Sequence, residues 1–258
     1  MDVIIFSGQS NMQGQTESLP YIQIVNGAYE YRMLEDNIIP LKHPVGENIN
    51  EVLLGAHEGN GSLLPAFCRA FVMKSGQNVL AVHAAKGATT IAEWLPDHFS
   101  RRYETMVRKV RGALRAAQNV DKVYFIWLQG ESDAIQGTKT DLYKQRMRLF
   151  RANLVKDLSV ITGFFMIRVG KFTEDDRDIE IIRAQEELCA DKEFVMLTRL
   201  TGYLTQRAKF MNPFAHGHYN NAGMEKLGAT AGRNLAKFRL GKPIILEKEP
   251  YPELSEKC

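Results

Sequence analysis

The chain has 258 residues, of which 45% are hydrophobic and 24% charged, as is ordinary for a globular protein. Its 33 basic and 30 acidic residues nearly balance, and no basic cluster indicates a nucleic-acid partner. No apolar run approaches the ~20 residues that cross a bilayer, so we expect no membrane segment. Because no signal peptide is visible, the chain as written is expected in the cytoplasm, or outside the cell if a leader has been removed.

Five short runs of β-branched and aromatic residues follow one another along the chain, and amphipathic helical patterns lie between them. This alternation is typical of a parallel sheet covered by helices on both faces. It predicts a three-layer α/β/α sandwich with a central, mostly parallel five-stranded sheet. The strand-like runs occupy residues 3–6, 79–82, 123–127, 164–167 and, more weakly, 194–197.

Two segments lack this pattern. Residues 14–60 contain many turn formers and predict long loops with one strand near residues 29–34. Residues 241–258 contain three prolines and many charges, which indicate a segment extended over the surface. We therefore expect one catalytic domain over residues 1–240 and an extended C-terminal tail over residues 241–258. An oligomer is compatible with such a tail but is not indicated.

Cysteine and histidine spacing gives no sign of a metal or another cofactor. Three cysteines fit no disulfide framework, and they share no metal-ligand spacing. His216 and His218 form a close pair, but no third ligand stands near them. We expect neither metal nor cofactor. The other residues considered are Cys68, Cys189, Cys258, His43, His57, His83 and His98.

Small and polar residues follow the first three strand-like runs, where ligands of parallel α/β sheets bind. These segments are GQSNM at residues 8–12, AKG at 85–87 and QGESD at 129–133. Ser10 comes directly after a strand and a glycine, which permits a sharp turn. A serine nucleophile needs a base within hydrogen-bond reach. Taken alone, Ser10 can equally be the N-terminal cap of a helix.

Four segments resemble blocks of a known superfamily. IIFSGQSNMQG (residues 4–14) resembles the first block of the SGNH hydrolases in their carbohydrate acetylesterase branch, which comprises carbohydrate esterase family six and the sialate O-acetylesterase-like proteins. AAKGATTIAEW (84–94), IWLQGESDA (126–134) and HGHYNNAGMEKLG (216–228) resemble the later blocks, in the same order. The resemblance implies a flavodoxin-like fold and a carboxylic ester hydrolase that removes acetyl groups from a carbohydrate partner, such as acetylated xylan or an O-acetyl sialic acid.

The resemblance also implies roles for particular residues. Ser10 would attack the acetyl carbonyl, and His218 would act as general base and then as general acid. The oxyanion of the tetrahedral intermediate would be held by the backbone N–H groups of Ser10 and Gly87 and by a side-chain amide. Gln129 is the best candidate for that amide.

One position departs from the superfamily pattern. An aspartate usually stands three residues before the catalytic histidine, whereas this chain has Ala215. Either a backbone carbonyl near His216 orients His218, leaving a Ser–His dyad, or Glu131 or Asp133 reaches the ring. Otherwise these two carboxylates organise the cleft or bind substrate, and His216 is an exposed loop residue or a substrate contact. A third alternative is a carbohydrate-binding relative with weak or no activity.

Ser132 offers a rival nucleophile. The segment GESDA resembles a nucleophile elbow with alanine in place of the final glycine. This interpretation predicts an α/β-hydrolase that uses Ser132, His218 and an acid such as Asp176. However, residues 135–138 intervene before the next helical pattern, and the GQSNM segment would have no role. We therefore favour Ser10.

Overall fold

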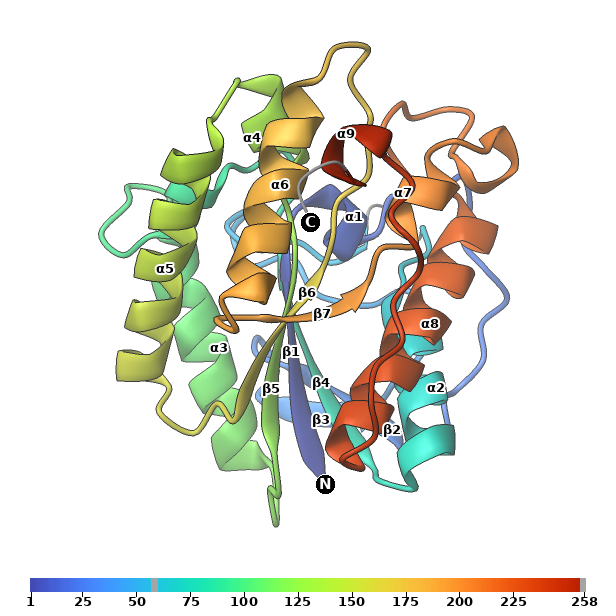
Figure 1. Ribbon diagram of the computed structural model, residues 1–258. Helices are drawn as coiled ribbons and strands as arrows, with labels where there is room; N and C mark the ends of the chain where they lie inside the picture. Colours follow the sequence, from blue (N-terminus) through green and yellow to red (C-terminus); the bar gives the residue numbers. More distant parts are fainter. Residues whose placement is uncertain (57–59, 256–258) are drawn as a thin grey trace.

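The computed structural model describes residues 1–56 and 60–255, so that His57 and Cys258 lie outside the described residues. A single sheet of seven strands runs through the described part of the protein in the order β3-β2-β4-β1-β5-β6-β7 (Figure 1). All neighbouring strands are parallel except the pair β2 and β3. The strands are β1 (Asp2–Gly8), β2 (Ala28–Arg32), β3 (Asn37–Pro40), β4 (Val79–Ala85), β5 (Val123–Leu128), β6 (Gly163–Ile167) and β7 (Val195–Thr198).

The predicted sandwich is confirmed, but the predicted number of five strands is wrong. Five strands match the five apolar runs, and β2 matches the strand expected near residues 29–34. The hairpin partner β3 was not predicted. It lies at the edge of the sheet, and its four residues are exposed or half-buried. A strand with so little burial leaves no continuous apolar run in the sequence, so its pattern cannot be told from that of a loop.

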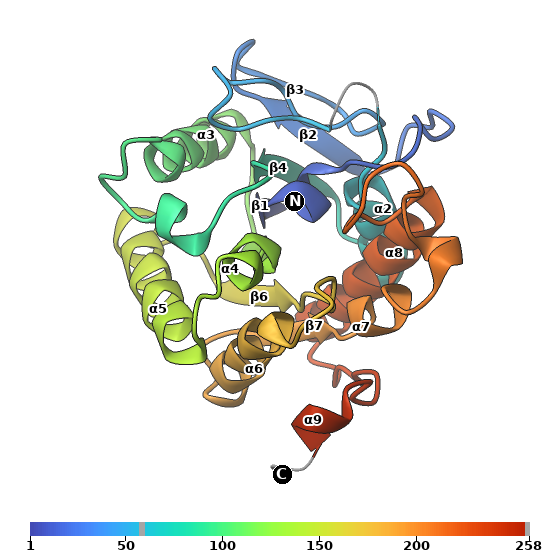
Figure 2. The ribbon, with the colours of Figure 1, turned by 90° about the horizontal axis from the view of Figure 1, so that it is seen from above.

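Helices cover both faces of the sheet (Figures 1 and 2). On one face lie α3 (Arg102–Ala116), α5 (Thr140–Asp157) and α6 (Arg177–Ala190), and on the other α2 (Leu64–Ser75) packs along α8 (Asn221–Arg239). Glycine permits this last approach, since a Cβ on Gly232 would lie 2.2 Å from the carbonyl oxygen of Phe67. The short elements are α1 (Ser10–Gln13), η2 (Ile91–Trp94), α4 (Glu131–Ile135), α7 (Thr201–Leu204), η3 (Ala208–Phe210) and α9 (Pro252–Ser255).

The three central strands end at the same level. Every residue of β1, β4 and β5 is buried, as expected for strands covered on both faces. In the register of the sheet, Gly8 stands beside Ala85 of β4 and Leu128 of β5. The segments that follow these strands therefore leave the sheet side by side. Gly8 has a φ of +144°, and a Cβ there would lie 1.9 Å from the carbonyl oxygen of Leu128. A glycine is thus required for the turn that leads to Ser10.

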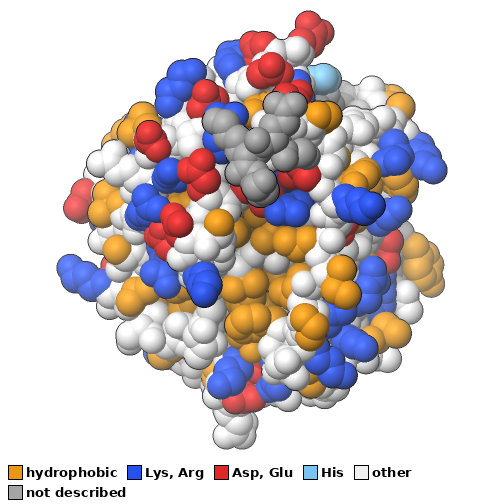
Figure 3. Space-filling model, viewed as in Figure 1, with side chains coloured by type: hydrophobic (Ala, Val, Ile, Leu, Met, Phe, Trp, Pro, Cys, Tyr) orange, Lys and Arg blue, Asp and Glu red, His pale blue; other side chains and the backbone are white. Residues whose placement is uncertain are grey.

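On the face viewed in Figure 1, acidic and basic side chains are interspersed (Figure 3). From residue 241 the chain runs back along the molecule without regular structure until α9. Among the helices in the described ranges, none is both long enough and apolar enough to cross a membrane.

Candidate active site

The segments that follow β1, β4 and β5 form the floor of a cleft of about 980 Å³. Other parts of its wall come from the turn at residues 216–218, which we call the histidine turn, and from the loop between β6 and α6. Of the residues singled out in the sequence, those that line the cleft are Ser10, Gly87, Glu131, Ser132, His216 and His218. Gln129 and Asp133 are wholly buried and do not line it.

Ser10 is the first residue of α1 and is 6% exposed. The first N–H groups of a helix have no partner within the helix, so the Ser10 N–H is available to a ligand. The backbone of Gly87 lies directly beside it, since a Cβ on Gly87 would stand 3.3 Å from the Cβ of Ser10. Ser10 and Gly87, which were expected at neighbouring strand ends, therefore lie side by side in the cleft.

The Gly87 N–H is engaged within the protein. It donates to Oε1 of Gln13 at 2.8 Å, while Nε2 of Gln13 donates to the carbonyl of Gly55 at 3.1 Å. Gln13 is buried and lines the cleft. A ligand that uses the Gly87 N–H therefore has to displace the side chain of Gln13.

Asn11 connects the first strand end to the histidine turn. Its Nδ2 donates to Oε1 of Glu131 at 2.8 Å and to the carbonyl of Gly217 at 3.1 Å. Its Oδ1 accepts a hydrogen bond from the N–H of Tyr219 at 3.3 Å. The residues on both sides of His218 are therefore bound by the side chain next to Ser10. Asn11 is fully buried, so water does not compete for these bonds.

The His218 ring is half-buried, and burial lowers its pKa below the ordinary value of 6.5. The carbonyl groups of Ala215 and His216 act on its pKa in the opposite direction, and this effect is smaller. Nδ1 is buried and makes no hydrogen bond within residues 1–56 and 60–255. Backbone carbonyls are thus the polar groups that favour the protonated ring.

The two carboxylates expected as alternatives are engaged elsewhere. Glu131 accepts from Asn11, and Asp133 Oδ2 accepts from the N–H of Ile91 at 2.8 Å and from Nε2 of Gln129 at 2.7 Å. Burial raises the pKa of both carboxyl groups. Within the described part of the chain, neither is hydrogen-bonded to His218. Their contacts organise the floor of the cleft.

The amide of Gln129 has no hydrogen left for a ligand. Its Nε2 donates to Asp133 at 2.7 Å and to the carbonyl of Thr89 at 2.8 Å, with Oε1 of Gln9 as a longer third acceptor at 3.3 Å, so both hydrogens of the NH₂ group are used within the protein. Its Oε1 accepts from the hydroxyl of Tyr143 at 3.1 Å. The side chain is fully buried and ties η2 to the end of β5.

Gln9 is a cleft residue that the sequence reasoning missed. Its Oε1 accepts from the N–H of Ser132 at 3.1 Å, from Nε2 of Gln129 at 3.3 Å and from the N–H of Gly130 at 3.4 Å, which directs its own Nε2 away from these donors. Nε2 makes no hydrogen bond in the described ranges, yet it is not among their buried unpaired atoms. Because Gln9 lines the cleft, this amide faces it. The only signal in the sequence was its position beside Ser10 in a strand-end turn.

The remaining wall comes from the segment after β6. Phe172, Thr173, Glu174 and Asp175 line the cleft, and Nε2 of the exposed His216 lies 3.3 Å from the carbonyl of Phe172. Asp176, the acid of the rival interpretation, forms an exposed ion pair with Lys171 at 2.6 Å. Among the described residues, no group of three His, Cys, Asp or Glu side chains is arranged to hold a metal.

The mostly parallel sandwich, with a serine after the first strand and His218 at the same cleft, shares its fold with a lipase/acylhydrolase from Enterococcus faecalis, which is 13% identical with a TM-score of 0.56 and covers 92% of this chain and 97% of its own. The chain belongs to the family described as carbohydrate esterase, sialic acid-specific acetylesterase, whose sequence profile matches residues 1–237. The protein is therefore a carboxylic ester hydrolase, and the expected family is confirmed.

Solved structures share the fold at low identity. A protein from Arabidopsis thaliana is 19% identical with a TM-score of 0.60, covering 93% of this chain and 98% of its own. NanS is 16% identical with a TM-score of 0.59 and the same two coverages. A carbohydrate acetylesterase from Xanthomonas citri is 12% identical with a TM-score of 0.58, covering 93% of this chain and 57% of its own. A search of curated proteins gives no match.

The bonds of Asn11 can be tested by truncation. Asn11→Ala leaves the buried carboxylate of Glu131 and the N–H of Tyr219 without their partner, so we expect a loss of about 1–3 kcal/mol in unfolding free energy. Urea unfolding measures this loss, and hydrogen exchange should be faster at the Tyr219 amide. Asn153→Ala, at an exposed hydrogen bond on α5, is the control and should change stability by less than about 0.5 kcal/mol. Unchanged stability and exchange in Asn11→Ala would refute the connection.

Proposed function

We propose that the protein removes O-acetyl groups from carbohydrates through an acetyl-enzyme formed on Ser10, with His218 as general base. One observation carries this proposal. Ser10 and His218 line the same cleft, and the side chain of Asn11 bonds to the residues on both sides of His218. Membership in an esterase family supports catalysis over the alternative of a binding protein without activity.

The reaction has two halves. Oγ of Ser10 attacks the acetyl carbonyl carbon while the His218 ring takes the hydroxyl proton. The ring then gives this proton to the sugar oxygen as the C–O bond breaks, which leaves acetyl-Ser10 and a free sugar hydroxyl. A water molecule attacks the acetyl-enzyme, again losing its proton to His218, and acetate departs as Ser10 recovers its hydrogen.

Three donors are candidates for the oxyanion. The Ser10 N–H is available at the start of α1, and the Gly87 N–H becomes available when Gln13 is displaced. Gln9 supplies the side-chain amide in this proposal, because both amide hydrogens of Gln129 donate within the protein. Gln129 keeps a supporting role through its contacts with Thr89 and Asp133.

The histidine works without a carboxylate partner in this proposal. The carbonyl groups of Ala215 and His216 favour the protonated ring, which supports the dyad among the alternatives left open by Ala215. The ring nitrogen opposite Nδ1 is then the one that exchanges protons with Ser10. In such a dyad the position of the ring depends on the backbone around His218. Asn11 fixes this backbone by its hydrogen bonds to Gly217 and Tyr219.

Ser10→Ala tests the nucleophile. We expect turnover of 4-nitrophenyl acetate to fall by at least about 10³-fold, because the proposed acetyl-enzyme forms on the Ser10 hydroxyl. Ser132→Ala is the matched control, since Ser132 lines the same cleft and contacts Gln9 through its backbone N–H alone. It should keep activity within about tenfold of the wild type. Full activity in Ser10→Ala with loss in Ser132→Ala would establish the rival nucleophile.

The pH dependence follows from the burial of His218. A general base has to be neutral, and burial lowers the pKa of His218 below 6.5, so the neutral ring persists into more acidic solution than a free imidazole. We expect kcat/KM to be constant near neutrality and to fall as the pH drops through a single pKa below 6.5. A pH profile of kcat/KM on 4-nitrophenyl acetate measures it. An acidic limb centred above 6.5 would contradict the assignment.

Of the two sugar classes considered, one observation favours O-acetyl sialic acids. Lys86 lines the cleft and makes no ion pair within the described residues, so its ammonium group can receive a substrate carboxylate. The family's description also names sialic acid. Acetylated xylan oligosaccharides built of xylose alone have no carboxylate for this contact.

Lys86→Met tests this preference. We expect kcat/KM to fall about tenfold on an O-acetyl sialic acid, because a charge-assisted hydrogen bond is lost, and to change by less than about twofold on 4-nitrophenyl acetate. A panel with acetylated xylan oligosaccharides completes the comparison. If the xylan oligosaccharides are the better substrates and Lys86→Met leaves every rate unchanged, the sialic acid assignment fails.

A further inference from the structure

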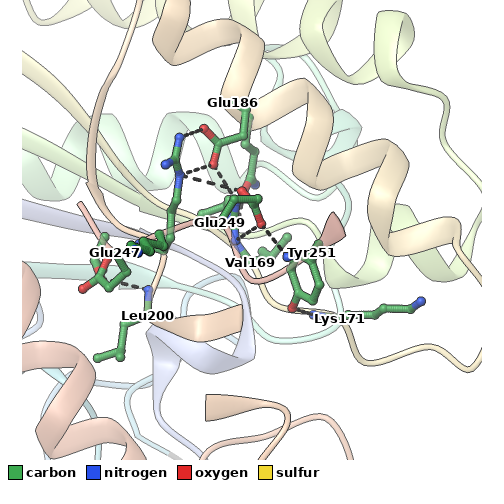
Figure 4. Close-up of polar contacts among 12 residues, drawn as sticks. Val169, Lys171, Glu186, Leu200, Glu247, Glu249 and Tyr251 are labelled. Carbon is green, nitrogen blue, oxygen red and sulfur yellow. Dashed lines mark hydrogen bonds and ion pairs between the residues drawn. The ribbon is translucent and has the colours of Figure 1, made fainter. Parts of the chain in front are cut away.

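The loop that forms one wall of the cleft has two supports. It joins β6 to α6, and its residues 172–175 face the cleft. The carboxylate of Asp178 accepts from the N–H groups of Phe172 at 3.0 Å and Thr173 at 2.6 Å. The second support comes from the far end of the chain, where the phenol oxygen of Tyr251 accepts from the N–H of Lys171 at 2.8 Å (Figure 4).

Tyr251 is held in place by a buried charge. Arg168 follows β6 and its side chain is 0% exposed. It pairs with Glu186 of α6 at 2.6 Å and with Glu249 of the C-terminal segment, and its guanidinium lies 5.4 Å from the centre of the Tyr251 ring. Burying an arginine without a partner carries a large desolvation cost, so loss of the pair with Glu249 would destabilise the protein.

Further contacts bind the C-terminal segment to the residues that follow β6 and β7. The carboxylate of Glu247 accepts from Oγ1 of Thr198 at 2.9 Å and from the N–H of Arg199 at 2.8 Å. Pro250 packs against Gly202, where a Cβ would lie 2.5 Å from the proline ring. Tyr251 itself is 4% exposed. Residues 247–251 are therefore a docked segment, which we call the strap, and they lie beyond the residues matched by the family profile.

We propose that the strap holds the substrate-facing loop in place and that Tyr251 is a positioning residue for recognition of the sugar. Tyr251 fixes Lys171, the residue immediately before the cleft-lining Phe172. The carbonyl of Phe172 in turn contacts His216 at the cleft, and its ring lies 5.7 Å from that of Tyr219. Displacement of Tyr251 would therefore alter the cleft wall through Lys171.

The effect should depend on the size of the substrate. A small acetate ester needs Ser10, His218 and the oxyanion donors, which lie on other segments. The alcohol part of an acetylated sugar is larger, and the inference assigns it to the wall formed by residues 172–175, which line the same cleft. This inference rests on the proposed function, because it assigns the wall to the sugar part of the same substrate.

The test is Tyr251→Phe, which removes the hydroxyl and keeps the ring. On an O-acetyl sialic acid or an acetylated xylan oligosaccharide, we expect KM to rise about three- to tenfold with kcat within about twofold of the wild type. On 4-nitrophenyl acetate, the change in KM should be smaller than on the sugar. Thermal unfolding of each variant shows whether the fold is intact.

Tyr203→Phe is the matched control. The Tyr203 hydroxyl donates to the carbonyl of Lys248 at 3.0 Å in an exposed hydrogen bond, so its loss leaves both the anchor of the strap on Arg168 and the contact with Lys171 in place. It should leave KM for the sugar unchanged. Glu249→Gln weakens the anchor on Arg168 and should shift KM in the same direction as Tyr251→Phe.

The inference is overturned if Tyr251→Phe, folded as judged by thermal unfolding, leaves KM for the sugar within about twofold of the wild type. It is also overturned if KM rises equally on both substrates, or if Tyr203→Phe has the same effect. This failure is distinct from failure of the proposed function, which Ser10→Ala tests separately. Loss of activity in Ser10→Ala without a KM effect in Tyr251→Phe rejects the strap alone.

Discussion

The arrangement of this cleft depends on the buried amide of Asn11. The side chain stands next to Ser10 at the end of β1, and it bonds to Gly217 and Tyr219 at the opposite end of the chain. His218 lies between those two residues. The positions of hydroxyl and imidazole are thus linked through one side chain whose oxygen and nitrogen are both used. Because Glu131 also accepts from Asn11, the third strand end is part of the same connection.

The same network explains why the carboxylates near the cleft do not orient the histidine. Glu131 and Asp133 follow β5 and are buried, which raises the pKa of each. One oxygen of each carboxylate is bound, Oε1 of Glu131 to Asn11 and Oδ2 of Asp133 to Gln129 and the N–H of Ile91, and these bonds fix the floor and the start of η2. A floor of this kind holds backbone N–H groups and amides in place before a substrate arrives, which is how preorganised donors lower a barrier. Among the described residues neither carboxylate is hydrogen-bonded to His218, and the carbonyl groups of Ala215 and His216 act on its pKa in the direction that favours the protonated ring.

Much of the fold and part of the site could be predicted from the sequence. Strands buried on both faces give continuous apolar runs, so β1, β4 and β5 could be recognised in the sequence. The exposed strand β3 gave no such signal. Ser10, Gly87 and His218 could be placed at one edge because the ends of parallel strands converge and the blocks resemble a known family.

Side-chain direction could not be predicted in the same way. Gln9 and Gln129 are both amides beside strand ends, and only the three-dimensional contacts distinguish the one that faces the cleft from the one that is buried. The C-terminal segment illustrates a second limit. Its glutamates look like solvated surface charges in the sequence, whereas Glu249 is paired with a buried arginine that lies 81 residues away. A long-range pair between single residues leaves no local pattern.

The most direct measurement is covalent labelling of the nucleophile. An organophosphate ester such as diethyl 4-nitrophenyl phosphate reacts with a serine that a neighbouring base activates, and peptide mass spectrometry then locates the phosphoryl group. The convergence of the first strand end and the histidine turn predicts a single label on Ser10 with loss of esterase activity. A label on Ser132, or complete loss of activity without a label on Ser10, would contradict it.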